Sequence, residues 1–124
     1  MSIIHEKESY AIMGLALRCI GIRDADSSRR FARSALRLSL HAAKFRIKAR
    51  PGLSIFYKGH PLTCKYFPDF ICYDRVIVEL KAVSLLTDEH RARVHNYLRG
   101  TDYRLGLLVN FAHYPKFQYE RIVL

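Results

Sequence analysis

Residues 66–83 read YFPDFICYDRVIVELKAV, and in this stretch charged side chains are grouped tightly inside strongly apolar sequence. Two short apolar runs, 67–72 and 76–80, are separated by Tyr73-Asp74-Arg75, and β-branched residues dominate the second run. Strand-forming residues on both sides of a short polar break are typical of a β-hairpin. The sequence therefore predicts that residues 67–72 and 76–81 are antiparallel neighbours.

The second run carries an acid and a base on one face of the predicted strand. Side chains alternate across a strand, so Glu79 and Lys81 share a face with Ile77, while the apolar residues between them share the other. If residues 73–75 form the loop, Asp69 lies directly opposite Glu79, and Cβ atoms in that relation are roughly 4.5–5.5 Å apart. Two carboxylates this close repel each other unless a proton or a cation lies between them. A divalent metal is the natural occupant, and the nearby lysine suits a site that handles a polyanion.

The spacing of these residues matches a nuclease pattern. Pro68-Asp69, nine further residues and then Glu79-Leu80-Lys81 reproduce the PD-(D/E)xK pattern of the restriction-endonuclease-like nuclease superfamily. That pattern is short, and a Glu-x-Lys strand end is in many proteins only a solvated edge with an ordinary ion pair. Here the chain resembles the small bacterial GxxExxY family of that superfamily in order and spacing, over most of its length after about residue 35. The segments that carry the resemblance are 56–59, 76–83, His90, Tyr97-Leu98 and 105–111.

The resemblance implies an α/β fold with a restriction-endonuclease-like core, in which a mixed four- to five-stranded sheet is flanked by helices. It also implies hydrolysis of phosphodiester bonds in nucleic acid with Mg²⁺ or Mn²⁺ as cofactor. Asp69 and Glu79 would bind the metal, with the Leu80 backbone carbonyl as a further ligand, and Lys81 would orient the attacking water or stabilise charge that develops on the phosphate. The residue types agree, because Mg²⁺ prefers hard oxygen ligands and keeps several waters, so two carboxylates suffice as protein ligands.

The segment for which the family is named is altered in this chain. In the family it supplies a further acid from an N-terminal helix. One alignment, with a three-residue insertion, places that acid at Asp26, whereas an alignment without gaps places it at Arg29 and loses it. Asp26 is therefore a candidate catalytic residue, although its place before a predicted helix equally suits an N-cap. A glutamine of the family falls on Arg93, whose charge could bind a phosphate or partly substitute for the cation. His90 matches a frequent histidine of the family, and the sequence leaves open whether it lines the site.

Positive charge is concentrated in the first half of the chain. The net charge is +10, and thirteen of the 21 lysine and arginine residues but only four of the 11 acids occur up to Lys65. A helix is predicted from about residue 28 to 43, with an apolar face toward the core made of Phe31, Ala35, Leu38 and Ala42. A second stripe with the same period is basic and contains Arg30, Arg33, Arg37, His41 and Lys44.

A basic stripe of this kind favours a polyanionic partner, because its side chains can reach successive phosphates. We expect DNA or RNA to contact Arg30, Arg33, Arg37, Lys44 and Arg93. A charged surface that only meets water is the alternative.

The segments before the hairpin predict a helix and two extended pieces. A mostly buried helix is expected from about residue 8 to 19. Two short extended pieces are expected between 45 and 57 around Pro51-Gly52, followed by a further turn at 58–61 that leads into the hairpin.

The segments after the hairpin predict a helix and two strands. Thr87 is expected to cap a helix that ends near residue 100, with Asp88 and Glu89 in the first turn, where the helix dipole favours acids. An apolar run at 104–111 has the length of a buried strand, and 119–124 predicts a final edge strand.

Size and composition predict one domain, residues 1–124, because the chain is too short for a second core and half of its residues are apolar. No apolar run approaches the roughly 20 residues that span a bilayer, and the first residues carry acids where a signal peptide needs a basic start. We therefore expect a cytoplasmic protein with no membrane partner. Cys19, Cys64 and Cys72 lie among apolar residues and are expected to be reduced core thiols.

Three functions remain open from the sequence. The first is a small Mg²⁺-dependent nuclease, which the intact Asp69, Glu79 and Lys81 favour. The second is a catalytically weakened nucleic-acid-binding or protein-interaction module that kept the fold, which the altered GxxExxY segment and Arg93 favour. The third is a homodimer or accessory subunit whose basic helix contacts an acidic protein.

Overall fold

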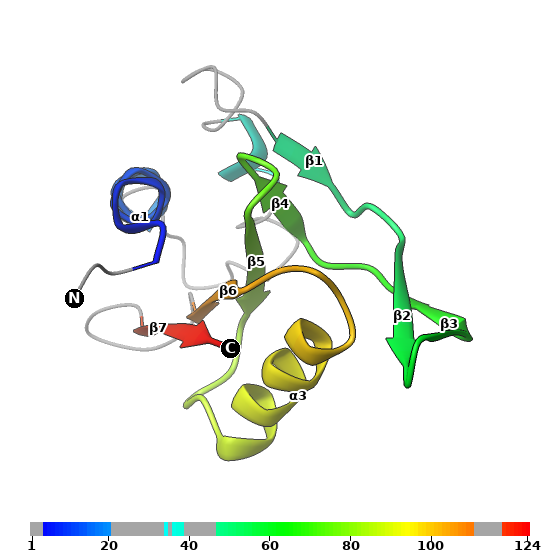
Figure 1. Ribbon diagram of the computed structural model, residues 1–124. Helices are drawn as coiled ribbons and strands as arrows, with labels where there is room; N and C mark the ends of the chain where they lie inside the picture. The colour runs from blue at the N-terminus through cyan, green and yellow to red at the C-terminus, as the bar shows by residue number, and fades with distance from the viewer. Residues whose placement is uncertain (1–3, 21–33, 35, 39–46, 111–117) are drawn as a thin grey trace.

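The computed structural model describes residues 4–20, 34, 36–38, 47–110 and 118–124 (Figure 1). A five-stranded sheet in the order β1-β4-β5-β6-β7 forms the centre, and β2 and β3 form a separate two-stranded sheet. The elements are α1 (Glu6–Ile20), β1 (Ile47–Ala49), β2 (Leu53–Tyr57), β3 (His60–Tyr66), β4 (Phe70–Cys72), β5 (Val76–Lys81), α3 (Asp88–Arg99), β6 (Leu105–Asn110) and β7 (Gln118–Val123).

The sheet is mixed, as the sequence predicts. Strand β5 pairs with β4 in antiparallel orientation and with β6 in parallel orientation, and β7 closes the far edge antiparallel to β6. Parallel neighbours cannot be joined by a tight turn, so α3 crosses between β5 and β6. The α/β class with a mixed five-stranded sheet and flanking helices is therefore confirmed.

The two faces of β5 belong to two hydrophobic clusters. Val76, Val78 and Leu80 pack in the cluster that contains Ile12 of α1, whereas Ile77 packs in the cluster that contains Leu98 of α3. Alternation along the strand thus places Glu79 and Lys81 on the α3 side of the sheet. The predicted division of this strand into two faces is confirmed.

The predicted apolar face of the second helix is wrong at Leu38. Residues 34 and 36–38 are helical, but Leu38 is 72% exposed and Leu36 is fully buried in the α1-side cluster. Helix residues two positions apart, such as Leu36 and Leu38, lie about 200° apart around the helix axis, so only one of these leucines can enter the core. Leu36 and Leu38 thus place apolar side chains on two different sides of the helix. Packing against the sheet buries the side that carries Leu36.

Strand β4 begins at Phe70 instead of residue 67. Pro68 has no N–H to donate to a ladder, and the N–H of Asp69 donates to the Glu79 side chain instead of the neighbouring strand. Phe67 is exposed. The three-residue loop is confirmed, since Cys72 pairs with Val76 across it.

The turn expected at 58–61 is shorter, because β3 already starts at His60. Tyr57 pairs with His60 around a two-residue loop in which Lys58 has φ 50° and Gly59 has φ 79°. Positive φ at both central residues is the requirement of a type I′ hairpin turn, and glycine meets it without steric cost. The expected extended pieces around Pro51-Gly52 are confirmed as β1 and β2, whereas β3 was not predicted.

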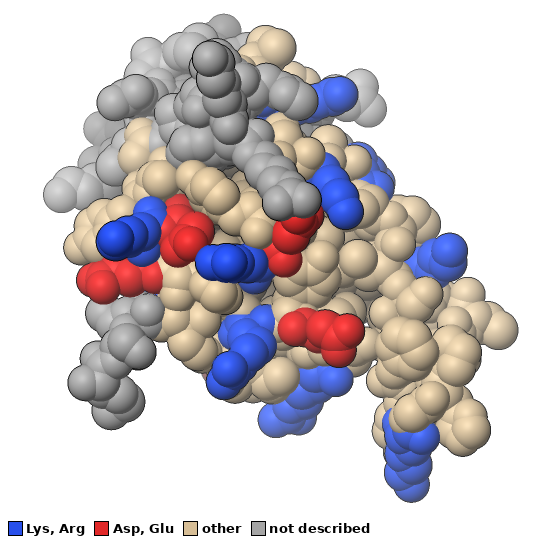
Figure 2. Space-filling model, turned by 45° about the horizontal axis from the view of Figure 1, so that its top comes forward, with Lys and Arg blue, Asp and Glu red and all other residues tan. Residues whose placement is uncertain are grey.

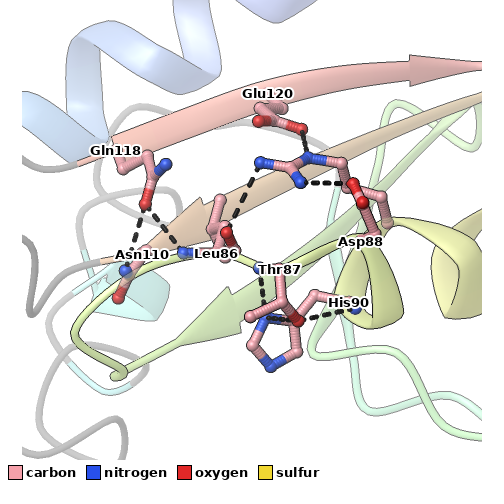
Figure 3. A network of polar contacts seen from close by, with 8 residues as sticks. Leu86, Thr87, Asp88, His90, Asn110, Gln118 and Glu120 are labelled. Atoms are coloured by element: carbon pink, nitrogen blue, oxygen red, sulfur yellow. Dashed lines mark hydrogen bonds and ion pairs between the residues drawn. The ribbon is translucent and has the colours of Figure 1, made fainter.

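Polar contacts hold the first turn of α3, and the loop before it, against the last residue of β6 and the first half of β7 (Figure 3). Arg91 donates to Glu120 at 2.6 Å and to Asp88 at 2.9 Å. Fully buried Asn110 accepts from the Val83 N–H at 3.0 Å, and Gln118 accepts from the Leu86 N–H at 3.0 Å. These bonds fix the loop that directly follows Lys81.

The helix predicted after Thr87 is confirmed. Thr87 accepts from the His90 N–H, and the His90 ring accepts from the Thr87 N–H at 3.1 Å, which completes a capping box. The His90 side chain is therefore part of the N-terminal cap of α3. Helix α1 extends two residues further at its start than predicted and one at its end.

Candidate active site

The hairpin register brings Asp69 and Glu79 together. Phe70 pairs with Val78, so the next position outward places Asp69 opposite Glu79, as predicted. The contact is reciprocal: Asp69 Oδ2 accepts from the Leu80 N–H at 2.8 Å, and Glu79 Oε1 accepts from the Asp69 N–H at 3.1 Å. Asp69 is only 3% exposed. Each carboxylate is thus held in place by the backbone of the opposite segment.

Tyr66 is a third member of this group that sequence reasoning did not identify. Its hydroxyl donates to Glu79 Oε1 at 2.9 Å, and its buried ring stacks on Tyr97 of α3 with centroids 3.7 Å apart and planes 12° apart. Burial, and then the neighbouring Glu79 charge, raise the pKa of Tyr66, so its hydroxyl stays protonated and remains a donor. Its position three residues before Asp69 is the one sequence signal that could have suggested it.

The environment of Glu79 opposes its negative charge. Burial raises the pKa of this carboxyl above its usual value, and the Asp69 charge raises it further. Hydrogen bonds from Tyr66 and from the Asp69 N–H, and then the Lys81 charge, act in the opposite direction on that pKa. A buried acid held beside a half-buried one therefore creates a place where an added positive charge is stabilising.

The donor set fits a hard divalent cation. Both hydrogen bonds to Glu79 end on Oε1, and within the described part of the chain no donor reaches Oε2. Carboxylate oxygens are the ligands that Mg²⁺ and Mn²⁺ prefer. Among the described residues no group of three or more histidine, cysteine, aspartate or glutamate side chains that could hold a metal ion occurs.

Lys81 lies on the same face of β5 as Glu79, and its charge lowers the Glu79 pKa. It is partly exposed, and no ion pair or hydrogen bond ties its ammonium group to any of the described residues. An ammonium group in this position is able to meet an anionic substrate at the edge of the acid pair.

Several predicted site residues are not tested by the described structure. Asp26, Arg30, Arg33 and Lys44 lie outside the described residues. The role of the Leu80 carbonyl as a ligand stays a prediction, and the structure assigns the Leu80 N–H to Asp69.

Of the predicted phosphate contacts, two are described. Arg37 is exposed on its helical segment. Arg93 is exposed on α3, one turn before Tyr97 on the same face, and its guanidinium lies 3.9 Å from Glu89. Both are accessible to a polyanion.

Cys64 and Cys72 are both free thiols, as predicted; Cys72 is buried, but the predicted core position is wrong for Cys64, which is exposed on β3. The side chain of Cys19 lies outside the described residues. No helix among the described residues is long and apolar enough to cross a membrane.

Comparison with protein families matches residues 7–122 to the PD-(D/E)XK nuclease superfamily, and the chain belongs to this superfamily. No curated protein matches the chain. Among solved structures, the crystal structure of SSO0001 is similar, with a TM-score of 0.54 and 16% identity over 96% of this chain. The chain spans 60% of the length of that protein, and at this identity the likeness shows the fold alone.

Proposed function

We propose that this protein is a Mg²⁺- or Mn²⁺-dependent nuclease of the GxxExxY family that hydrolyses phosphodiester bonds in DNA or RNA. The observation that supports this most strongly is the reciprocal hydrogen bonding of Asp69 and Glu79, which holds two carboxylates together at the end of a buried hairpin. Such a pair does not stabilise the fold by itself, because the burial and mutual repulsion of two carboxylates are unfavourable unless a proton or a cation lies between them. Membership of the nuclease superfamily supplies the matching substrate class.

Each side chain of the group has a role in this proposal. Asp69 and Glu79, with the Leu80 carbonyl, would hold the ion, which when bound polarises the phosphate and lowers the pKa of a water molecule. Tyr66 orients Glu79 and lowers the pKa of its carboxyl group through their hydrogen bond. Lys81 orients the attacking water or neutralises charge on the phosphate as the bond from water oxygen to phosphorus forms and the ester bond to the leaving oxygen breaks.

Substrate affinity would come mainly from the basic residues. With a net charge of +10, the protein attracts a polyanion, and we assign phosphate contacts to Arg30, Arg33, Arg37, Lys44 and Arg93. Asp26 is proposed as the further acid of the family. If so, its carboxylate lies within about 4–5 Å of Asp69 or Glu79, the span of one cation and two ligand bonds. The single-domain organisation and the cytoplasmic location stay predictions.

A second candidate function is a nucleic-acid-binding or protein-interaction module with weakened catalysis, acting alone or as a homodimer. It is favoured by Arg93 at the family's glutamine position and by the altered segment around Asp26. The two candidates differ in whether the wild-type protein cleaves.

The test is cleavage of labelled single- and double-stranded DNA and RNA in Mg²⁺, Mn²⁺ or EDTA. We expect metal-dependent cleavage by the wild type and none by Lys81→Ala, because that change removes the charge beside the acid pair. Affinity for nucleic acid should change little, since the other basic residues are intact. Lys7→Ala, at an exposed position of α1, is the matched control and should cleave normally. Binding without cleavage by the wild type in either metal would establish the second candidate instead.

A further inference from the structure

The β2–β3 hairpin stands to one side of the five-stranded sheet, on the side of α3 (Figure 1). Every residue of β3 except Tyr66 is exposed, and no core residue comes from the outer part of the hairpin. A two-stranded ribbon is at most marginally stable by itself. Its base is anchored, because the Phe56 N–H donates to the Gly100 carbonyl at 2.9 Å at the end of α3, and Ile55 packs on the same glycine. The exposed outer part is therefore held in a defined place without serving the core.

Large apolar and aromatic side chains are displayed on this hairpin. Phe56 is 51% exposed, Tyr57 is 62% exposed, and Leu62 is also exposed. Exposed rings grouped on one projecting element are a feature of interaction surfaces, since isolated apolar residues are normal but clusters are costly in water. The hairpin thus has the character of a binding surface.

The charged side chains of the hairpin itself are all basic, and Asp74 and Asp102 border the same cavity as Phe56 at its base. Residues 27–68 contain no aspartate or glutamate. Lys58 at the tip places its ammonium 5.5 Å from the centre of the Tyr57 ring, and Lys65 lies on β3. In Figure 2 the arm at the lower right carries basic residues and no acidic ones. A polyanion complements this surface, whereas a neutral partner would leave the lysines unpaired and a basic partner would be repelled.

The types of side chain favour unpaired nucleotides over a duplex. Residues 51–68 contain no arginine, asparagine or glutamine, which are the usual readers of base edges in the grooves of DNA. They do contain aromatic rings beside lysines, the combination that binds single strands by stacking on bases and contacting phosphates. We propose that the β2–β3 hairpin binds a single-stranded segment of the nucleic-acid substrate, without sequence preference, through Tyr57 together with Lys58, whose ammonium lies beside the Tyr57 ring. This deepens the proposed nuclease function and rests on it.

The hairpin leads directly to the candidate active site. Strand β3 runs from His60 near the tip of the hairpin to Tyr66, whose hydroxyl reaches Glu79. From His60 to Tyr66 the strand spans about 20 Å at its usual rise. That length corresponds to about six nucleotides at the stacked spacing of one strand. A strand bound at the tip could therefore extend along β3 to the acid pair.

The test measures binding of fluorescein-labelled (dT)20 and U20 by anisotropy, with EDTA present so that no cleavage occurs. The variant is Tyr57→Ala/Lys58→Ala, and the matched control is Lys7→Ala/Tyr10→Ala, at two exposed positions of α1. Because one stacked base and one phosphate contact are lost, we expect affinity of the variant to fall about five- to a hundredfold for one or both oligonucleotides. The slope of log affinity against log salt should become shallower by roughly 0.7 for the lost lysine contact. The control should bind like the wild type.

The outcomes separate this proposal from the nuclease itself. Equal affinities of variant and wild type, or failure of the wild type to bind either oligonucleotide, would overturn the hairpin proposal even if the wild type cleaves duplex in Mg²⁺. A variant that loses affinity only for a (dT)20·(dA)20 duplex overturns it as well. A third outcome would also overturn the proposal: sedimentation shows a dimer for the wild type and a monomer for the variant, while both bind the oligonucleotides equally. The hairpin would then join two copies of the chain. Reduced single-strand binding with no cleavage by the wild type supports the hairpin while the nuclease proposal fails.

Discussion

Replacing Glu79 with glutamine should make the metal-free protein more stable at neutral pH. Glutamine has the same shape, and its carbonyl oxygen can still accept from the Tyr66 hydroxyl and the Asp69 N–H. The substitution removes the negative charge that burial and Asp69 disfavour. A single change therefore separates the electrostatic cost of the acid pair from its hydrogen bonds.

The size of the expected gain in folding stability follows from the strand register that places Asp69 opposite Glu79. Cβ atoms on directly opposed positions are roughly 5 Å apart, and two charges at that separation repel by about 3 kcal/mol at an effective dielectric constant of about 20. The attraction between Glu79 and Lys81 is lost at the same time and offsets part of this. We expect a net stabilisation of roughly 1–2 kcal/mol, which for a chain of this length raises Tm by about 3–10 °C.

The gain should depend on pH with a defined sign. The pKa of Glu79 in the folded protein is raised above its ordinary value near 4.5, so between the two values the folded state binds more protons than the unfolded state. The contribution of Glu79 to wild-type stability is therefore fully present below its unfolded pKa and is lost as pH rises through its folded pKa. The variant should match the wild type near pH 4 and become the more stable of the two as pH rises through the folded pKa of Glu79.

The assay is thermal unfolding by circular dichroism from pH 4 to 8, in EDTA and in Mg²⁺ or Mn²⁺. Metal should raise the Tm of the wild type and leave that of the variant almost unchanged, because a ligand of the folded state is lost. Glu89→Gln, the same substitution on the exposed surface of α3, is the control and should stay close to the wild type. A variant that is less stable than the wild type in EDTA at pH 7, with an unchanged response to metal, would refute the acid-pair reasoning.

Two further predictions concern Tyr66 and the cysteines. Tyr66→Phe keeps the ring stacked on Tyr97 but removes a hydrogen bond that lowers the Glu79 pKa. The acidic limb of the pH profile of metal-dependent cleavage should therefore move to higher pH. An acidic limb at the wild-type position would argue against a role for the hydroxyl. Burial raises the pKa of the Cys72 thiol to about 12, so iodoacetamide should label exposed Cys64 rapidly in the native protein and Cys72 only after unfolding, as peptide mass mapping would show.

The sequence by itself determined the central hairpin and the pairing of its acids. Strand register depends on loop length and on an alternation of period two, and both can be counted along the chain. The arithmetic that places Asp69 opposite Glu79, with Lys81 on the same face, needed no information from other elements. The cap at Thr87 and the buried strand near residues 105–110 are local signals of the same kind.

Only the tertiary structure decided which distant groups meet the acid pair. The Tyr66 hydroxyl is held at Glu79 because the Tyr66 ring stacks on Tyr97 of α3. This contact joins segments that are far apart along the chain. The choice of Leu36 over Leu38 depended on the sheet against which the helix packs. Strand β3 was missed because its residues are almost all exposed, so it lacks the alternation that marks a strand with one buried face. Local patterns record which side of an element faces the core, whereas contacts between elements depend on how the whole chain packs.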